Sequence, residues 1–266
     1  MPVSGSVIVT GAASGIGRAV AGRLAVDGFH VVAVDRTAID LDAAVGALSD
    51  AGLSATAVAG DVRDRETHRR AREAARTHGP VRAWVGCAGI TRLHDLADLD
   101  ETGVREVVDI NQFGLLWGAS EAVAEWVSSG ETGVAVAISS VHARHAAERH
   151  QIYEMTKAAA EALVRSIAVT YGRAGIRAVA IAPGAIETPA LRQSLRSAPD
   201  PQAAEQRLKM FPPLERIGLA TDVADAVAFV ISDQASYISG TVLTVDGGWS
   251  AVLARDAPEE SARRQA

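Results

Sequence analysis

Tyr153 and Lys157 lie four residues apart in the segment Y-E-M-T-K, and both side-chain types can take part in proton transfer. Residues at this spacing leave a helix from the same face, so we expect the phenol and the ammonium to be neighbours. A cation about 5 Å from a phenolate stabilises it by roughly 3 kcal/mol at an effective dielectric near 20. The pair therefore predicts a tyrosine that acts as general acid and base near neutral pH. A solvent-exposed Tyr beside a Lys on an ordinary helix is the alternative.

The choice of lysine at position 157 supports the catalytic interpretation. Lys157 and Lys209 are the two lysines of the chain, and every other basic position apart from histidine holds arginine. An arginine keeps its charge, but it binds through a planar fork and does not release a proton. A lysine beside the tyrosine therefore indicates a task that arginine does not perform.

A glycine-rich segment, T-G-A-A-S-G-I-G at residues 10–17, joins a predicted strand to a predicted helix. In such a segment Gly11 permits a tight turn, Gly15 lets the backbone approach a pyrophosphate, and Gly17 allows close packing of helix on strand. The helix N-terminus favours the negative charge of the phosphates. Because the strand precedes it and the helix follows, the segment predicts a dinucleotide site. A loop that only turns the chain is the alternative.

Two acidic positions follow the second and third predicted strands. Asp35 lies eighteen residues after Gly17, where a carboxylate accepts hydrogen bonds from both ribose hydroxyls of NAD and repels a 2′-phosphate. Asp35 therefore favours NAD. NADP is the alternative, because Arg36 beside it can pair with that phosphate. Asp61 and Val62 are expected to flank the adenine. Asp61 is equally suited to cap the helix after it, and the two roles are compatible.

The elements that must position these residues are Val- and Ile-rich strands alternating with Ala-rich helices. This alternation predicts an α/β fold, a doubly wound parallel sheet of the Rossmann type with about seven strands and helices on both faces. We expect strands at 6–10, 30–34, 55–60, 82–87, 133–140, 176–182 and 241–245, and helices at 16–27, 39–51, 65–78, 104–128, 153–171 and 222–231. A single domain over 1–254, an inserted proline-rich lid at about 188–216 and a disordered tail at 255–266 complete this prediction.

Composition narrows the classes of function. The 266 residues are 48% hydrophobic, and the net charge of −6 with no long basic run argues against a nucleic-acid partner. The single cysteine, Cys87, excludes an internal disulfide. The sequence contains no run of ~20 apolar residues, so no membrane span is predicted. The first predicted strand begins near residue 6 and leaves no room for a leader, so a cytoplasmic location is expected.

The order and spacing of several motifs resemble the short-chain dehydrogenase/reductase family over residues 10–248. The glycine loop resembles the cofactor loop of that family, and Tyr153-x-x-x-Lys157 resembles its signature pair. Ser140, thirteen residues before Tyr153, matches its catalytic serine, whereas Ser139 lacks that spacing. The other matching elements are Cys87-Ala88-Gly89, Asn111 in D-I-N-Q-F-G, Pro183-Gly184 followed by Thr188, and Asp246-Gly247-Gly248.

The resemblance implies hydride transfer between nicotinamide and a carbinol or carbonyl carbon, with Tyr153 exchanging the hydroxyl proton. It also implies that Ser140 binds the substrate oxygen, that Lys157 binds the nicotinamide ribose, and that Asn111 holds a water in a proton path. Plain structural roles remain open: a backbone cap for Ser140, a buried amide for Asn111 and a helix cap for Thr188. Cofactor contacts are expected from Gly11, Ser14, Gly15, Ile16, Gly17, Asp35, Arg36, Asp61, Val62, Cys87, Ala88, Gly89, Tyr153, Lys157, Pro183, Gly184, Ile186 and Thr188.

One position departs from the family pattern, because Cys87 stands where the family has asparagine. We expect this cysteine to pack as a small hydrophobe rather than to act as a catalytic thiol. The segments expected near the substrate carry Arg92, His94, His142, Arg144, His145, Arg149 and Arg192. They suggest a polar or carboxylated substrate, and a solvated loop is the alternative. No carboxylate or thiol cluster accompanies the three loop histidines, so no metal site is predicted.

The sequence thus predicts an NAD-dependent dehydrogenase or reductase of a small-molecule secondary alcohol or ketone. An NADPH-dependent ketoreductase of a polyketide-like or carrier-tethered substrate is the nearest alternative, since Arg36 suits a phosphate. A cofactor-sensing protein without turnover, and an isomerase- or dehydratase-like reaction on the same scaffold, are further alternatives. The resemblance also implies a homo-oligomer, a dimer or a tetramer.

Overall fold

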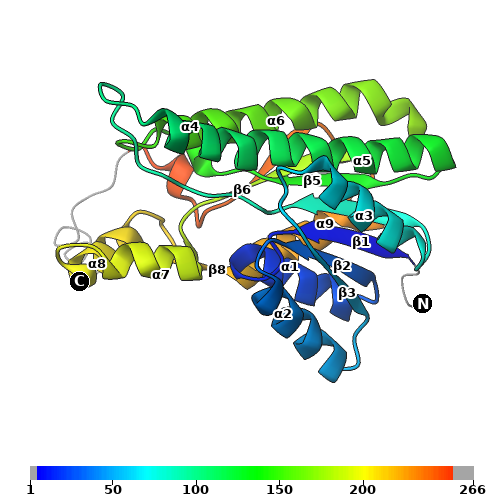
Figure 1. Cartoon of the computed structure of the whole chain (residues 1–266). Coiled ribbons are helices and arrows are strands. Elements are labelled where there is room, and N and C mark those ends of the chain that lie inside the picture. The colour runs from blue at the N-terminus through cyan, green and yellow to red at the C-terminus, as the bar shows by residue number, and fades with distance from the viewer. Residues whose placement is uncertain (1–4, 254–266) are drawn as a thin grey trace, which may run out of the picture.

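The computed structural model describes residues 5–253, and its centre is a parallel sheet of seven strands (Figure 1). The order β3-β2-β1-β4-β5-β6-β9 reverses direction between β1 and β4, which is where such folds bind their ligands. The predicted doubly wound fold is therefore confirmed. The strands are β1 (Ser6–Thr10), β2 (His30–Asp35), β3 (Ala55–Ala59), β4 (Val81–Gly86), β5 (Val134–Ile138), β6 (Arg177–Pro183) and β9 (Thr241–Val245).

Helices cover both faces of the sheet, and each face has its own apolar core. Alternate residues of a strand point to opposite faces, so Val7 and Val9 belong to one core and Ile8 to the other. In Figure 1, α1 and α2 lie below the sheet and α4, α5 and α6 above it. The first core packs against α1 (Gly15–Val26), α2 (Ala38–Asp50) and α9 (Ala220–Ile231), and the second against α3 (Arg65–Arg76), α5 (Gly114–Ser129) and α6 (Gln151–Tyr171).

The helical stretch expected over 104–128 is confirmed, since the chain is helical from Glu101 to Ser129, but it is not α-helical throughout. The chain forms α4 (Glu101–Val108), a π-helical turn over Asp109–Phe113, and then α5. A π turn holds one residue more than an α turn. Here the turn contains Asn111, whose side chain bonds to both backbone groups of Ile90. Apolar periodicity carries no information on such a contact, so the sequence pattern did not predict the interruption.

The proline-rich segment contains two helices, α7 (Pro189–Arg196) and α8 (Pro201–Met210). Both begin with a proline at the first helical position, where its missing N–H costs no hydrogen bond. Thr188 and Asp200 cap them by accepting hydrogen bonds from the backbone. The short strands β7 (Ile186–Glu187) and β8 (Gly218–Leu219) pair at the base of this insertion. The tail expected at 255–266 lies outside the described residues.

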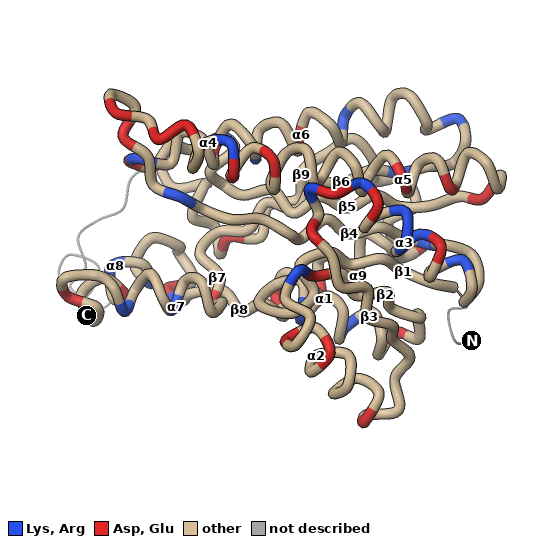
Figure 2. Tube along the Cα trace, viewed as in Figure 1, with Lys and Arg blue, Asp and Glu red and all other residues tan. Residues whose placement is uncertain are grey.

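The arginines of α3 bind acidic residues within the protein. Arg65 and Arg72 lie 2.8 and 2.7 Å from the two carboxylate oxygens of Glu121 on α5, which is buried. A buried carboxylate needs such partners to offset its lost hydration. In Figure 2 acidic and basic residues are interspersed along this region. Among the described residues, no helix is long and apolar enough to cross a membrane.

Candidate active site

The glycine loop has the backbone shape that its sequence predicts. Gly11 and Gly15 adopt φ values of +70° and +53°, which glycine reaches without strain. A side chain at Gly17 would place its Cβ 2.1 Å from the carbonyl oxygen of Gly11, so only glycine lets α1 begin this close to β1. Thr10 secures the facing segment, since its hydroxyl accepts hydrogen bonds from the N–H groups of Cys87 and Ala88 at 3.1 and 3.2 Å.

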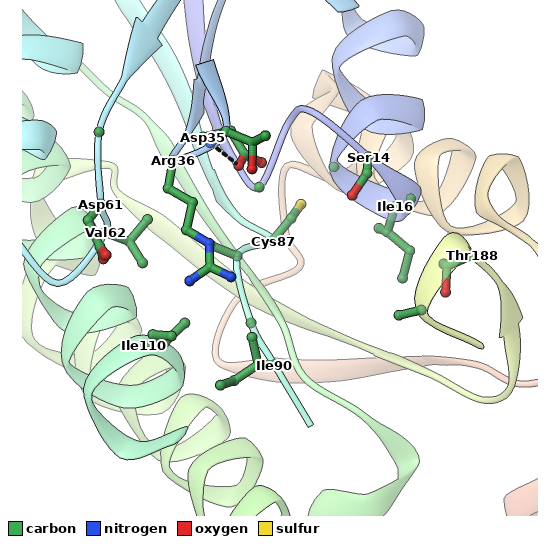
Figure 3. A pocket seen from close by; sticks show the side chains of 18 residues that line it. Ser14, Ile16, Asp35, Arg36, Asp61, Val62, Cys87, Ile90, Ile110 and Thr188 are labelled. Carbon is green, nitrogen blue, oxygen red and sulfur yellow. Dashed lines mark hydrogen bonds between the residues drawn. The ribbon is translucent and has the colours of Figure 1, made fainter. Parts of the chain in front are cut away.

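A cavity of about 350 Å³ lies at the carboxyl ends of the strands, beside this loop (Figure 3). It combines the start of α1, the ends of β2, β3 and β4, and the start of the insertion. Its lining includes these predicted cofactor residues: Gly11, Ser14, Gly15, Ile16, Gly17, Asp35, Arg36, Asp61, Val62, Cys87, Ala88, Gly89 and Thr188. The lining also includes five residues that the sequence did not predict: Thr37, Gly60, Ile90, Ile110 and Ala190. Each neighbours or nearly neighbours a predicted residue, so adjacency was the one available signal.

Five predicted cofactor residues do not line this cavity: Tyr153 and Lys157, whose positions are described below, and Pro183, Gly184 and Ile186. Pro183 ends β6, and the N–H of Gly184 donates to the carbonyl of Val245 at 3.0 Å. A Cβ at Gly184 would lie 2.8 Å from the Cβ of Asp246, so glycine permits the close approach of these two strand ends. Ile186 faces a second cavity, bounded by the return segment of the insertion. Their roles toward a cofactor stay predictions.

The ribose end of the cavity holds an acid and a base side by side. The carboxylate of Asp35 accepts one backbone hydrogen bond at each oxygen, from Ala13 and Thr37, both at 3.1 Å. Each carboxylate oxygen can accept a second bond, so the group keeps capacity for ribose hydroxyls. Arg36 reaches across the cavity near Val62 (Figure 3), and it forms no ion pair within residues 5–253.

Asp61 does not cap the following helix, so that part of the prediction is wrong. Asp64 is the cap, and its side chain accepts from the N–H of Glu66 at 2.9 Å. Asp61 instead binds Arg63, with 2.7 Å between Oδ2 and the guanidinium. This hydrogen bond holds the pKa of Asp61 below its usual value. Val62 is buried and lines the cavity, and its contact with an adenine stays a prediction.

Lys157 and Tyr153 leave α6 on the same face, at its first turns. The ammonium lies 5.5 Å from the centre of the phenol ring, close to the separation expected from the spacing. Lys157 is buried, and its Nζ donates to the carbonyl oxygen of Ile138 at 2.8 Å, which ties α6 to the end of β5. Gly89 lies beside it, since a Cβ built there would be in ordinary van der Waals contact with Nζ at 3.5 Å. Lys157 thus borders the cavity through Gly89.

The two serines after β5 have different surroundings. Ser139 donates its hydroxyl toward the carbonyl of Lys157 at 3.2 Å and toward the buried carboxylate of Glu161 at 3.3 Å. Ser140 accepts from the N–H of His142 at 3.1 Å and begins a short 3₁₀ turn. The first hydroxyl therefore stabilises the packing of β5 on α6. The second has its own proton free of any acceptor among the described residues, which suits a substrate oxygen.

Asn111 has the buried structural role that the sequence left open. Its side chain donates to the carbonyl of Ile90 and accepts from the N–H of Ile90, both at 2.8 Å. It also donates to Thr156 at 3.2 Å. The amide therefore joins the π turn, the segment after β4 and α6, and so fixes the cavity wall next to Lys157. Its part in a proton path stays a prediction.

Cys87 packs against the apolar core beside the glycine loop. Burial raises the pKa of its thiol to about 12, although the nearby Lys157 acts in the opposite direction. A thiol with that pKa is neutral at physiological pH and is a poor nucleophile. The structure therefore agrees with packing rather than catalysis at this position.

Most of the arginines expected near a substrate are already paired. Arg92 lies 3.1 Å from Glu106, Arg144 lies 2.9 Å from Glu161, and Arg192 pairs with Glu187. These pairs weaken the case for a carboxylated substrate. Among the described residues, no group of histidine, cysteine or acidic side chains could hold a metal ion.

The cavity fits a dinucleotide on three grounds. At Gly11, Gly15 and Gly17 no side chain separates the backbone from the cavity. The helix α1 begins at its edge without an acidic residue in the first turn, so the positive end of the helix dipole is available to phosphates. The carboxylate of Asp35 lines the cavity and keeps capacity to accept further hydrogen bonds. Fold and cavity together define a dinucleotide-binding protein of the Rossmann class.

Comparisons with known proteins refine this class. A family model described as Enoyl-(Acyl carrier protein) reductase matches residues 11–250. The chain is 36% identical over 249 residues to 3beta-hydroxysteroid dehydrogenase 1 of Eggerthella lenta, covering 91% of this chain and 92% of that protein. It is also 36% identical over 247 residues to the cis-4-hydroxycyclohexanecarboxylate dehydrogenase of Sinomonas cyclohexanicum, with coverage of 92% and 96%. The chain belongs to the short-chain dehydrogenase/reductase family of NAD(P)-dependent oxidoreductases.

A solved structure agrees with this membership. The crystal structure of a variant of actinorhodin polyketide ketoreductase with NADPH superposes with a TM-score of 0.88 at 27% identity. The match covers 95% of this chain and 100% of that one. The fold is therefore shared over nearly all of the chain.

Proposed function

We propose that the protein is an NAD-dependent dehydrogenase or reductase of secondary alcohols and ketones, with Tyr153 as its general acid and base. The observation that carries the proposal is the buried ammonium of Lys157, 5.5 Å from the ring of Tyr153 and beside the cavity wall at Gly89. Burial of a charge costs free energy unless hydrogen-bond partners offset the lost hydration. An ammonium has three donors, and the carbonyl of Ile138 takes one of them, so Lys157 keeps donors for a ligand. The two relatives are named as dehydrogenases of ring-bearing hydroxy compounds.

In this proposal the cofactor, when bound, supplies the hydride acceptor or donor. Tyr153 removes the proton of the substrate hydroxyl during oxidation and returns it during reduction. Lys157 stabilises the phenolate and donates to the ribose. Ser140 donates to the substrate oxygen and stabilises its developing charge. Asn111 holds the segment at Ile90 against α6 and keeps the wall of the site in position.

NAD is the proposed cofactor because Asp35 would repel a 2′-phosphate. NADPH is the second candidate, since the unpaired Arg36 lines the same cavity and a structural neighbour was solved with NADPH. Replacing Asp35 by Ala is expected to lower kcat/KM for NADH by about tenfold, through the loss of a charge-assisted hydrogen bond. Replacing Arg36 by Leu should leave the value for NADH unchanged if NAD is the natural cofactor. A large loss with NADPH alone would support the second candidate.

The remaining parts of the proposal concern the insertion, the assembly and the location. The helices α7 and α8 form a substrate lid over 188–216, and the domain extends over 1–254. The protein forms a dimer or a tetramer in the cytoplasm. Light scattering at several protein concentrations tests the assembly, and a monomer at every concentration would contradict it.

The test of the function is a screen of alcohols and ketones of varied size and charge, followed at the absorbance band of NADH and NADPH. Turnover of secondary alcohols, or of the matching ketones, is the expected result. Cofactor binding without turnover of any compound would instead support a cofactor-sensing protein. A product formed without change in the cofactor absorbance would support an isomerase or dehydratase.

A further inference from the structure

Two imidazole rings, His142 and His150, lie next to the phenol of Tyr153, and two further rings from distant segments of the chain, Trp249 and Phe211, continue the series. His142 follows the catalytic serine, His150 precedes α6, Trp249 follows β9, and Phe211 ends α8. We call these four side chains the ring wall. None of them was assigned a role in proton transfer or cofactor binding.

The rings form a continuous series of contacts from the insertion to the catalytic tyrosine. Phe211 stacks on Trp249 with 5.0 Å between ring centres and 5° between planes. Trp249 meets His142 edge to face at 6.2 Å, and His142 stacks on His150 at 5.3 Å. His142 and His150 each meet Tyr153 edge to face, at 6.3 and 6.4 Å. These separations are those of favourable aromatic pairs.

The ring wall is partly exposed, so its free faces are available to a ligand. His142, His150 and Trp249 are half-buried, and Phe211 is exposed over 41% of its surface. A soluble fold that only needed apolar packing would bury such rings in one of its two cores. Partly exposed aromatic groups gathered beside a reactive group are instead typical of a binding surface.

The central imidazole of the ring wall, His142, is held in its neutral form. His142 bonds through Nδ1 to the carbonyl of His145, and burial lowers the pKa of its imidazole. His150 bonds through Nδ1 to the carbonyl of Glu148. The neighbouring cation Arg144 is neutralised by Glu161. The surface beside Tyr153 is therefore largely aromatic, and the pairing of Arg144 makes it less basic than the sequence suggested.

We propose that the ring wall binds the hydrocarbon ring of the substrate, and that the protein prefers neutral cyclic secondary alcohols and ketones, with Trp249 as the main specificity-determining residue. This inference rests on the proposed function for the position of the reacting oxygen at Tyr153. A flat or chair-shaped ring meets aromatic faces over a wide area and loses little internal freedom on binding. An open chain of the same size makes fewer simultaneous contacts and loses rotational freedom.

The test compares cyclohexanol with 2-hexanol, two secondary alcohols of equal carbon number, and with cis-4-hydroxycyclohexanecarboxylate. The native protein should show about tenfold higher kcat/KM for cyclohexanol than for 2-hexanol. Trp249→Leu should reduce this ratio to about twofold, mainly through the value for the ring. Trp117→Leu is the matched control, since Trp117 is equally half-buried but lies on α5 against Arg65. It should keep the native ratio.

A binding measurement separates this inference from the proposed function. Cyclohexanone does not react with the NAD⁺-loaded protein, so its binding can be followed by tryptophan fluorescence. We expect saturable binding that Trp249→Leu weakens by about tenfold and Trp117→Leu leaves unchanged. If the ketone binds in this way but no alcohol is oxidised, the proposed function fails and the ring wall stands. Equal turnover of ring and chain in the native protein, a ratio unchanged in Trp249→Leu, or clear preference for the carboxylated ring would overturn the inference.

Discussion

The cofactor edge and the substrate edge of the sheet are built in different ways. At the cofactor edge the backbone itself makes the site, through Gly11, Gly15 and Gly17 at the start of α1. At the substrate edge side chains make it, through rings from two loops and the insertion. A backbone site cannot be altered by one side chain without moving the chain. A side-chain site can change its ligand while the fold stays the same.

The largest effect is expected where a side chain is added to the backbone site. In Gly17→Ala the new Cβ would meet the carbonyl oxygen of Gly11 at 2.1 Å, so helix and loop must separate. We expect cofactor binding about 100-fold weaker and a free energy of unfolding lower by about 3 kcal/mol. Isothermal titration with NAD⁺ and urea denaturation measure these changes.

Gly22→Ala is the control for this variant on the same helix. No heavy atom lies within 4 Å of its added Cβ, and alanine is favoured over glycine in a helix by about 1 kcal/mol. It should bind the cofactor normally and unfold at higher urea concentration. Equal cofactor affinity in both variants would contradict a backbone-built site.

A smaller effect is expected from acid. Burial lowers the pKa of His68 at the cofactor edge, and it does the same for His142 at the substrate edge. Below pH 6.5 the unfolded chain therefore binds protons that the folded chain does not, and stability is lost as pH falls. Above pH 6.5 both states hold these histidines neutral, and no stability is lost through their protonation.

The two edges should differ in this loss. His68 is buried and bonds through Nε2 to the carbonyl of Val62, whereas His142 is half-buried, so His68 should dominate. The free energy of unfolding, measured by urea between pH 7.5 and 5, should decline in the native protein and decline less in His68→Gln. A smaller change is expected in His142→Gln. If the free energy of unfolding declined less with falling pH in His142→Gln than in His68→Gln, His142 rather than His68 would dominate the loss.

The smallest effect is expected at Cys87, where a side chain lines the cofactor cavity without serving it. Because its thiol has a raised pKa of about 12, alkylation by iodoacetamide at pH 8 should be at least about 100-fold slower than for free cysteine. Cys87→Ala should keep kcat within about twofold, since only packing is lost. Intact-mass kinetics and a standard assay provide the two numbers. Rapid alkylation with parallel loss of activity would assign Cys87 a chemical role.

The sequence predicted the cofactor edge well, because glycine spacing and strand order reflect constraints on the backbone. The strands and their parallel arrangement follow from local pattern, and thirteen residues expected from motifs and from the family resemblance line the cavity. Three features did not follow from it. The π turn depends on the contact of Asn111 with Ile90, twenty-one residues away. The helices α7 and α8 begin at prolines that also suit a loop, and the cap at Asp64 competes with an equally suitable Asp61.

The substrate edge was predicted poorly for a different reason. The sequence analysis counted the arginines there as free charges, but Arg92, Arg144 and Arg192 each find an acidic partner in the fold. The rings of Trp249 and Phe211 reach Tyr153 through His142 from segments that no local pattern connects to it. Ion pairs and ring contacts between distant segments depend on tertiary structure, so composition alone suggested a charged site where the structure has an aromatic one.

The proton-transfer role of Tyr153 is measured most directly by comparing Tyr153→Phe with Tyr171→Phe in the turnover of one accepted alcohol. Tyr171 ends the same helix and packs against the core, so its replacement tests loss of a hydroxyl outside the site. Tyr153→Phe should lower kcat by about 1,000-fold with the affinity for NAD⁺ unchanged, whereas Tyr171→Phe should keep kcat near its native value. If Tyr153→Phe kept more than about a tenth of the native kcat, general acid–base catalysis by this phenol would be contradicted.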